Sequence, residues 1–407
     1  MKYIILGLGV AGVTAAKTIR QLDKDAEIDL FTDEMVYYYA RPKLFDVIHK
    51  RLSSREIYFY GPDWYTKNGF KLHFGVKAVK IDVKAHSVTF DDGITVKYDK
   101  LLIANGAHAF VPPIKGADKQ GVFTLRTLKD AFDIRDYSTY IGNGSPVAVV
   151  GGGVLGLEAA HSFRLNKLNP TVIEFAPYLL PRQLDKEGAD ILRKIFENAG
   201  IQIKTSSKTE AFEGSSAVDK VLLGSGEKLS AKMVLLSTGV RSNIELLKNS
   251  NLPFNRGALV DDYLKLQDFE DIFAAGDIAE YKGRVYGIIP PAIEQATVAG
   301  KNMVKEGSAE YHGSVMSNTL KVAGVDLTSV GIINPENKEE YEEIRAEAPA
   351  EGKYRKIVLK DGKAVGGISL GMKGESVPLT KFVKSGKDLS NFKEKLKDIN
   401  FSLKDVK

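Results

Sequence analysis

The sequence predicts an α/β protein built from two similar βαβ units and a smaller α+β domain at the carboxyl end. The first unit is predicted from an apolar strand at 3–6, a helix at 11–22 and a strand at 27–32. The pattern recurs about 144 residues later, as a strand, a helix and a strand at 147–150, 154–166 and 171–175. Strands that alternate with helices in this way indicate parallel sheets.

The length of 407 residues gives room for two or three domains. A proline break at 111–114 and a change of pattern beyond 314 suggest where they meet. The predicted domains are a discontinuous first one (1–109 and 237–313), a second (110–236) and a third (314–407). In the third, strands at 355–359 and 364–370 flank an Asp361-Gly362 turn.

Composition excludes several classes of protein. The chain is 43% hydrophobic and 27% charged, which is typical of a globular protein and not of a disordered, collagen-like or coiled-coil chain. A net charge of +5 is too small to indicate nucleic acid but allows an acidic partner. Glycines interrupt the apolar amino terminus and no run reaches about 18 apolar residues, so we expect no signal peptide, no membrane span and a cytoplasmic location.

The chain has no cysteine. This excludes disulfides, a thiolate nucleophile and cysteine-ligated zinc or iron–sulfur clusters. Its six histidines show no close ligand spacing, so we predict no metal site.

Two glycine motifs follow apolar strands and open helices. Each reads Gly-x-Gly-x-x-Gly, at Gly7, Gly9 and Gly12 and again at Gly151, Gly153 and Gly156. In such motifs the first glycine makes the tight turn, the second lets a pyrophosphate approach the backbone, and the third lets helix and strand pack closely. The pyrophosphate then lies at a helix amino terminus. The sequence therefore predicts two dinucleotide sites.

An acidic residue after the second strand of such a unit holds the ribose hydroxyls. In the second unit this is Glu174, and no arginine stands beside it to bind a 2′-phosphate, so NADH is favoured over NADPH. In the first unit the residue is either Asp33 or Glu34. Since hydride can pass from a nicotinamide to a flavin, FAD in the first unit and NADH in the second is the simplest assignment.

Four segments resemble motifs of the two-dinucleotide-fold flavoproteins related to glutathione reductase. They are Tyr39–Leu44, Tyr98–Ala107, Leu236–Asn243 and Ile272–Glu280. Asn105 departs from the usual threonine of the second segment. Arg182–Asp185 and Leu320–Gly324 resemble the NAD(P)H:rubredoxin oxidoreductases within that family. The resemblance covers nearly the whole chain and is weakest beyond about 335.

This resemblance implies roles for individual residues. Asp277 would bind the ribityl chain of FAD, Arg41 the pyrophosphate, and Ala292 would lie near the pyrimidine edge of the flavin. Glu158 would point between flavin and nicotinamide and position them. The other implied cofactor contacts are Pro42, Val79, Ala104, Gly106, Arg126, Gly239 and Gly276. Glu158, Arg41 and Ala292 each have a plain structural alternative, as a helix-face charge, a surface cation and a packing residue.

The missing cysteines restrict the electron acceptor. Thiol-based reduction of disulfides or peroxides is excluded, so the flavin passes electrons to a metal protein, a quinone, a dye or oxygen. Residues 381–407 hold eight lysines and four acids, which would suit an acidic rubredoxin. They also fit a solvated helix that packs through Phe382, Leu389, Phe392, Leu396 and Ile399.

The leading hypothesis is an NADH-dependent FAD oxidoreductase, a monomer or homodimer, that reduces an acidic electron-transfer protein such as rubredoxin. One alternative is a peroxide-forming NADH oxidase or the reductase component of a larger redox system. Another is an NADH-sensing flavoprotein of the apoptosis-inducing-factor type, which acts by binding partners.

Overall fold

A computed structural model describes residues 1–322 and 324–406, with side chains except at 318–322. Part of the Leu320–Gly324 motif thus lies outside the described residues. The chain forms two compact units, the first made of 1–44, 52–110 and 239–314, the second of 45–51, 111–238 and 315–407. The second unit contains both of the domains predicted at 110–236 and 314–407. The division of the chain into three domains therefore stays a prediction.

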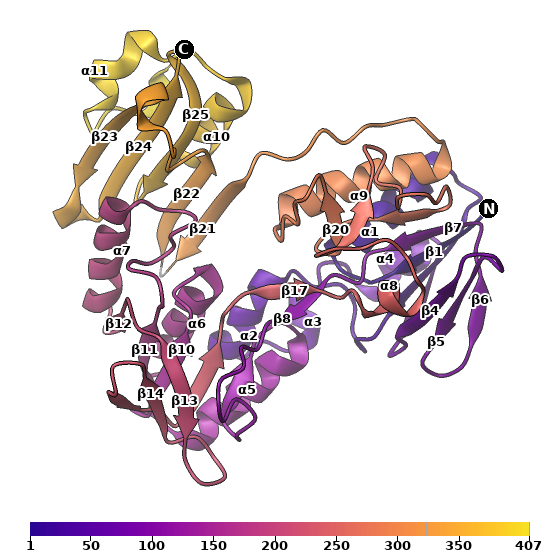
Figure 1. Cartoon of the computed structure of the whole chain (residues 1–407), viewed down its shortest axis with the longest axis horizontal. Helices are drawn as coiled ribbons and strands as arrows, with labels where there is room; N and C mark the ends of the chain where they lie inside the picture. Colours follow the sequence, from indigo (N-terminus) through magenta and orange to yellow (C-terminus); the bar gives the residue numbers. More distant parts are fainter. Residues whose placement is uncertain (323, 407) are drawn as a thin grey trace. The chain divides into compact units, whose positions relative to one another are not determined.

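The first unit is built on a five-stranded parallel sheet in the order β19-β7-β1-β2-β3. Its strands are β1 (Lys2–Leu6), β2 (Glu27–Thr32), β3 (Phe70–Phe74), β7 (Lys100–Ile103) and β19 (Ile272–Ala274). Helices α1 (Val10–Leu22) and α9 (Ile289–Val304) pack against each other beside this sheet (Figure 1). Their alanine-rich faces join the sheet in one hydrophobic core.

Smaller elements complete the first unit. Its antiparallel sheet is β4 (Ala78–Asp82), β5 (Ser87–Phe90) and β6 (Thr95–Lys97). Two strand pairs are β8 (Ala107–Ala109) with β17 (Val240–Ser242), and β18 (Ala258–Val260) with β20 (Ala279–Tyr281). The short helices are η1 (Arg41–Lys43), α3 (Ser54–Ile57), α4 (Pro62–Lys67) and α8 (Glu245–Asn249).

The second unit repeats the parallel architecture, in the strand order β12-β11-β10-β16-β9. The strands are β9 (Val122–Thr124), β10 (Pro146–Val150), β11 (Asn169–Ile173), β12 (Gln202–Lys204) and β16 (Met233–Leu236). The helices are α2 (Leu44–Lys50), α5 (Leu128–Ile141), α6 (Val154–Leu165) and α7 (Lys186–Asn198). An antiparallel sheet of β13 (Thr209–Glu213), β14 (Lys220–Leu223) and β15 (Lys228–Ser230) completes this part. Both predicted βαβ units are confirmed, although β11 ends two residues earlier than predicted.

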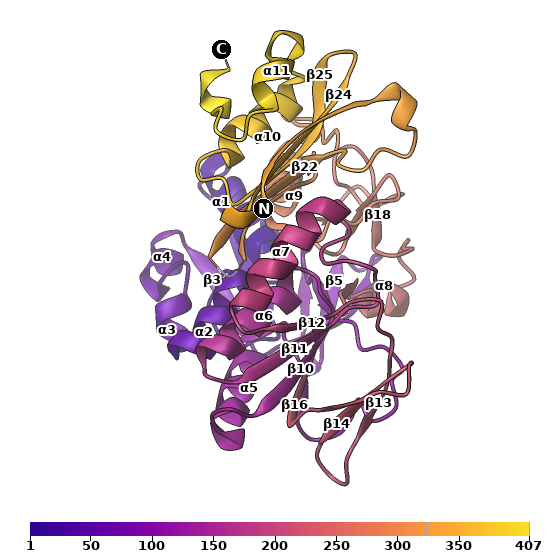
Figure 2. The same ribbon diagram turned by 90° about the vertical axis from the view of Figure 1, so that its left-hand side faces the viewer.

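The carboxyl-terminal part of the second unit is a five-stranded antiparallel sheet in the order β21-β22-β25-β24-β23. Its strands are β21 (Ser317–Val322), β22 (Val325–Gly331), β23 (Glu342–Ala348), β24 (Lys353–Lys360) and β25 (Lys363–Leu370). The predicted turn between β24 and β25 is present, with Asp361 and Gly362 both at positive φ (52° and 76°). Helices α10 (Ser376–Ser385) and α11 (Lys393–Leu396) lie on one face of the sheet (Figure 2). Short 3-10 turns occur at Lys338–Glu340, Pro349–Glu351, Ser390–Phe392 and Leu403–Asp405.

The lysine-rich tail does not form one continuous helix, which was one of the two interpretations of its sequence. Helix α10 ends at Gly386, whose left-handed backbone (φ 59°) closes the helix. Phe382, Leu389 and Leu396 do pack in the domain core. Ile399 is only half-buried and does not belong to that core, so its predicted packing is wrong.

Candidate functional site

The first glycine turn joins β1 to α1. Gly7 has φ +117°, and a Cβ there would lie 2.2 Å from the carbonyl oxygen of Ala104, at the end of β7. A Cβ on Gly12 would lie 1.9 Å from the carbonyl oxygen of Gly7. In contrast, a Cβ on Gly9 would meet no atom within 4 Å. The turn is therefore tightly packed on its inner side and open above Gly9.

The opening above Gly9 faces the start of a helix. No side chain caps α1 at Gly9, and its first turn holds no acidic residue. Free N–H groups and a positive helix dipole at such a position favour an anion. A pyrophosphate therefore fits the space that Gly9 leaves.

A second wall of this site comes from the segment after β19. A Cβ on Gly276 would lie 3.0 Å from Ala11 Cβ and 3.8 Å from Ala292 Cβ. Two predicted residues, Gly276 and Ala292, are therefore neighbours beside α1. The Gly276 N–H donates to Gln295 Oε1 (2.9 Å). Gln295 Nε2 and Asn105 Oδ1 are buried and have no hydrogen-bond partner among the described residues. Such orphaned polar atoms fit a polar cofactor such as FAD.

The two acidic residues predicted as alternative ribose-binding residues of the first unit have different surroundings. Asp33 is exposed. Glu34 accepts a hydrogen bond from the Tyr39 hydroxyl (2.5 Å) and pairs with Arg41 (3.6 Å). Glu34 and Arg41 thus belong to one cluster, next to the exposed Pro42.

Four other predicted contacts of the first unit are less informative. Gly106 accepts from the Asn243 N–H (3.0 Å), and Gly239 from the Phe110 N–H (2.9 Å), both beside the β8–β17 pair. Asp277 is half-buried, and its carbonyl accepts from the Ser242 hydroxyl (2.7 Å). Val79 lies in the antiparallel sheet, where its carbonyl accepts from Asn249. No contact recorded for the described residues joins Val79 to the glycine turn.

The second glycine turn joins β10 to α6 and has the same inner packing. A Cβ on Gly151 would lie 2.2 Å from the Ser237 carbonyl oxygen, and one on Gly156 would lie 2.0 Å from that of Gly151. A Cβ on Gly153 would again meet nothing within 4 Å. Both turns thus present an open glycine at the start of a helix.

The acidic residue of the second unit contacts its own turn. Glu174 accepts the N–H of Gly152 (2.5 Å) through one oxygen and that of Ala176 (2.6 Å) through the other. Sequence reasoning did not single out Gly152. A Cβ there would lie 2.8 Å from Leu179 Cδ2 and 3.0 Å from Glu174 Cβ, so a side chain would block this arrangement. The run of three glycines was the available signal.

Glu158 lies on α6 in a cluster of titratable side chains. Burial, and then the negative charge of Asp46 on α2, raise the pKa of Glu158 to about 7. Burial, and then His49, lower the pKa of His161. His49 itself lies 3.8 Å from Asp46 and 3.4 Å from the Ser162 hydroxyl. Glu158 can therefore gain or lose a proton near neutral pH.

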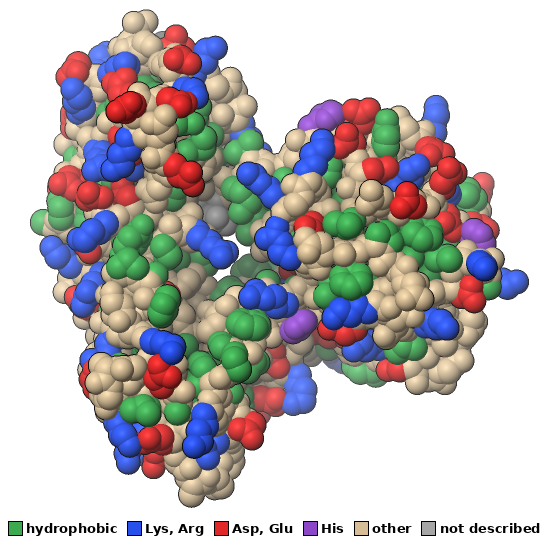
Figure 3. Space-filling model, viewed as in Figure 1, with side chains coloured by type: hydrophobic (Ala, Val, Ile, Leu, Met, Phe, Trp, Pro, Cys, Tyr) green, Lys and Arg blue, Asp and Glu red, His purple; other side chains and the backbone are tan. Residues whose placement is uncertain are grey.

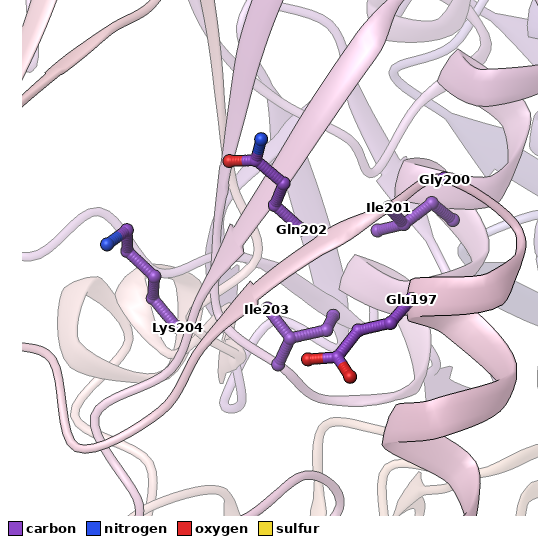
Figure 4. Close-up of a pocket in the computed structure, with 6 residues that line it drawn as sticks. All are labelled: Glu197, Gly200, Ile201, Gln202, Ile203 and Lys204. Carbon is purple, nitrogen blue, oxygen red and sulfur yellow. The ribbon is translucent and has the colours of Figure 1, made fainter.

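Arg126 precedes α5, and its backbone N–H donates to Asp130 (2.8 Å). A groove of about 460 Å³ lies elsewhere in this unit, between α7 and the edge strand β12 (Figure 4). It is lined by Glu197, Gly200, Ile201, Gln202, Ile203 and Lys204, none of which is a predicted site residue.

Comparison with known proteins identifies the family. Residues 1–302 match the family described as pyridine nucleotide-disulphide oxidoreductase. The chain belongs to this family. Residues 317–387 match the rubredoxin NAD⁺ reductase C-terminal domain. The predicted family and fold class are therefore confirmed.

Individual relatives point in the same direction. The NADH-rubredoxin oxidoreductase of Clostridium acetobutylicum is 33% identical over 96% of this chain and 96% of its own length. A crystal structure of NADH:rubredoxin oxidoreductase from that species aligns with a TM-score of 0.80 and 32% identity, covering 96% of both chains. A nitrite reductase of Bacillus subtilis is 34% identical over 96% of this chain but only 48% of its own length. The chain thus spans about half of that relative.

These findings place the chain in a family of NAD(P)H-dependent flavoprotein oxidoreductases. No helix within the described residues is long and apolar enough to cross a membrane. In the same residues, no group of three or more His, Asp or Glu side chains is placed to hold a metal ion.

Proposed function

We propose that the protein oxidises NADH at its second glycine turn and passes the electrons, through FAD at its first, to rubredoxin. The observation that carries this proposal is the pair of turns that are each open above the middle glycine, Gly9 and Gly153. FAD, when bound, supplies the step from hydride transfer to single-electron transfer. The chain supplies binding, orientation and charge.

Within the first unit, Gly9 and the start of α1 would hold the pyrophosphate of FAD, with the Arg41 guanidinium beside it. Glu34 would hold the ribose and Asp277 the ribityl chain. The apolar surfaces of Ala104, Gly106 and Ala292 would lie against the flavin, where the free amide of Gln295 is available to it.

Within the second unit, Glu174 supports NADH over NADPH. Its carboxylate is fixed at the turn by two backbone N–H groups, Gly152 and Ala176. A fixed negative charge there would accept the ribose hydroxyls and repel a 2′-phosphate. Glu158, whose pKa lies near neutrality, would face the nicotinamide and position it.

The outer face of α10 supports an acidic acceptor. Val377, Lys381 and Lys384 follow helical spacing, and Val377 is 76% exposed. Among the described residues, Lys381 and Lys384 have no ion pair, whereas Lys393 and Lys397 of the same tail are paired with Glu342 and Glu394. Acidic and basic side chains intermingle elsewhere on the visible face of this domain (Figure 3). Unpaired lysines around an apolar residue suit an acidic electron-transfer protein.

The test is anaerobic reduction of oxidised rubredoxin by the FAD-loaded protein and NADH. We expect rapid rubredoxin reduction that slows as salt rises. The double variant Lys381→Glu/Lys384→Glu should slow it severalfold, while the control Lys80→Glu/Lys84→Glu, with the same charge change on another surface, should not. If NADH reduces the flavin but no electrons reach rubredoxin, the proposal that rubredoxin is the acceptor is wrong.

A second candidate is supported by the relatives. Because the chain spans about half of the Bacillus subtilis nitrite reductase, it also fits the NADH-oxidising module of a larger redox system. In that case oxidised rubredoxin would be reduced slowly and the acceptor would be a separate protein. Fast turnover with oxygen alone would instead support an NADH oxidase, and slow reoxidation by every acceptor would support a redox sensor.

A further inference from the structure

Asp185 joins two parts of the second unit. Its side chain is buried and caps the start of α7, accepting the Gly188 N–H (3.1 Å). The same carboxylate accepts the Tyr354 hydroxyl (2.6 Å) and pairs with Lys356 Nζ (3.2 Å). Tyr354 and Lys356 belong to β24, about 170 residues further along the chain. The helix start is therefore held by the carboxyl-terminal sheet.

The surrounding charges make this contact a network. Lys356, only 1% exposed, also pairs with Glu343 (2.9 Å) on β23. Arg345 pairs with Glu343 (2.7 Å) and with Glu187 (3.3 Å) on α7. A buried, multiply paired network of this kind holds one geometry, because any displacement leaves a buried charge without a partner.

The side chains on the two faces of β24 contact different parts of the second unit. Side chains alternate along a strand, so Tyr354 and Lys356 point toward α7 while Arg355 points to the other face. There Arg355 pairs with Glu375 (2.6 Å) and donates to carbonyls of the terminal segment, including that of Phe401 (2.7 Å). One face therefore stabilises the domain itself, and the other contacts the neighbouring βαβ unit.

Asp185 ends the loop that leaves the second glycine turn. This loop, residues 175–184, is called the nucleotide loop below. It starts after Glu174, and its Leu180 N–H donates to the Gly152 carbonyl (3.3 Å). Leu180 has φ +52°, a left-handed conformation that a leucine adopts only when its surroundings hold it there. At the far end, Asn334 Nδ2 donates to the Leu184 carbonyl (3.2 Å), which adds a further contact from the carboxyl-terminal domain.

We infer that the carboxyl-terminal sheet positions the nucleotide loop through Tyr354, Lys356 and Asn334, and thereby sets the affinity for NADH. This inference rests on the proposed binding of NADH at the second turn. A loop held in place before the ligand arrives loses little freedom on binding, whereas a released loop must be ordered at the expense of affinity. Tyr354, Lys356 and Asn334 are positioning residues, since they act through Asp185 and Leu184.

The experiment compares variants of the FAD-loaded protein by anaerobic rapid mixing with NADH. Tyr354→Phe removes one hydroxyl, and Asn334→Ala removes one amide. For each we expect the dissociation constant of NADH to rise by roughly tenfold. The limiting rate of flavin reduction and the flavin content should stay within about twofold, because neither residue reaches the reacting atoms.

Two matched variants make the result specific. Tyr341→Phe removes a hydroxyl from the same domain. Within the part of the chain that the structure describes, that hydroxyl makes no hydrogen bond, so NADH affinity should not change. Lys356→Met should weaken NADH binding more than Lys356→Arg, which keeps the charge. Should Lys356→Met fail to fold, Tyr354→Phe and Asn334→Ala still decide the outcome.

The outcomes separate this inference from the proposed function. If the unaltered protein binds FAD but NADH does not reduce it, the proposed function is wrong. If NADH reduces it and both Tyr354→Phe and Asn334→Ala bind NADH normally, the inference is overturned. A lower limiting rate with unchanged NADH affinity would overturn it as well.

Discussion

The two glycine turns share an inner geometry and differ in what surrounds it. In both, the first glycine lies against a neighbouring strand end and the middle glycine is open. The residue between the first and the middle glycine is Leu8 in the first turn and Gly152 in the second. Leu8 packs into the core of its unit, whereas Gly152 leaves room for Glu174 and Leu179. We infer from this difference that the shared motif binds a pyrophosphate, while the residues around it determine which dinucleotide is bound.

The acids of the two units illustrate this. Glu34 contacts Tyr39 and Arg41, and the first glycine turn gains a second wall from Gly276 and Gln295. Glu174 is bound to the turn itself. Seven residues after the first glycine, one helix carries Thr14 and the other the titratable Glu158.

The largest expected effect on cofactor binding comes from placing a large side chain at each open glycine position. Gly9→Glu should abolish FAD binding, while Gly153→Glu should leave FAD bound and abolish its reduction by NADH. Both glycines have φ values that any residue adopts (−83° and −77°), so the fold should persist. Flavin content and anaerobic bleaching measure the two effects. Loss of flavin from both variants, in proteins that remain folded, would break the comparison.

A smaller effect is expected from neutralising the acids. Glu174→Gln should weaken NADH binding about tenfold and reduce discrimination against NADPH, since hydrogen bonds to a charged group are worth about 1.5–3 kcal/mol. Glu34→Gln, its counterpart, should speed the release of FAD and leave NADH affinity unchanged. Titrations with both nucleotides check this. Equal discrimination in the two variants would mean that Glu174 does not select the nucleotide.

The smallest effect concerns the pH dependence of stability. The pKa of Glu158 is raised to about 7, so the folded protein binds this proton more tightly than the unfolded chain, and stability falls as pH rises toward and through 7. Glu158→Gln, which stays neutral, should be more stable than the unaltered protein above pH 7, by about 2 kcal/mol after allowing for partial exposure. Near pH 4 the two should be alike.

Denaturant unfolding at both pH values measures the Glu158 effect. Glu347→Gln, which changes an exposed carboxylate on β23, serves as the control and should show no such dependence. An equal gain in stability for Glu158→Gln at both pH values would point to packing and not to ionisation.

Local patterns in the sequence predicted much of the fold. Both βαβ units, their glycine turns and the Asp361-Gly362 hairpin follow from apolar periodicity and turn residues that act over a few positions. The same information failed for the tail beyond Lys381, where Gly386 ends the helix and the chain folds back in short turns.

Contacts between distant residues could not be predicted in this way. The hydrogen bond from Tyr354 to Asp185 joins side chains far apart in sequence, and that from Gly276 to Gln295 depends on how α9 packs. The bond between Glu174 and Gly152 was closer to prediction, because the run of three glycines and the acid were both visible. Only the fold showed that they meet.

The central claim is that the first unit holds the flavin and the second delivers hydride to it from a nicotinamide nucleotide. Anaerobic titration of the FAD-loaded protein with NADH, following the visible absorbance of the flavin, tests this most directly. The account predicts complete bleaching by one equivalent of NADH, and bleaching only at much higher concentration by NADPH. Failure to bind FAD, or a bound flavin that neither nucleotide reduces, would contradict it.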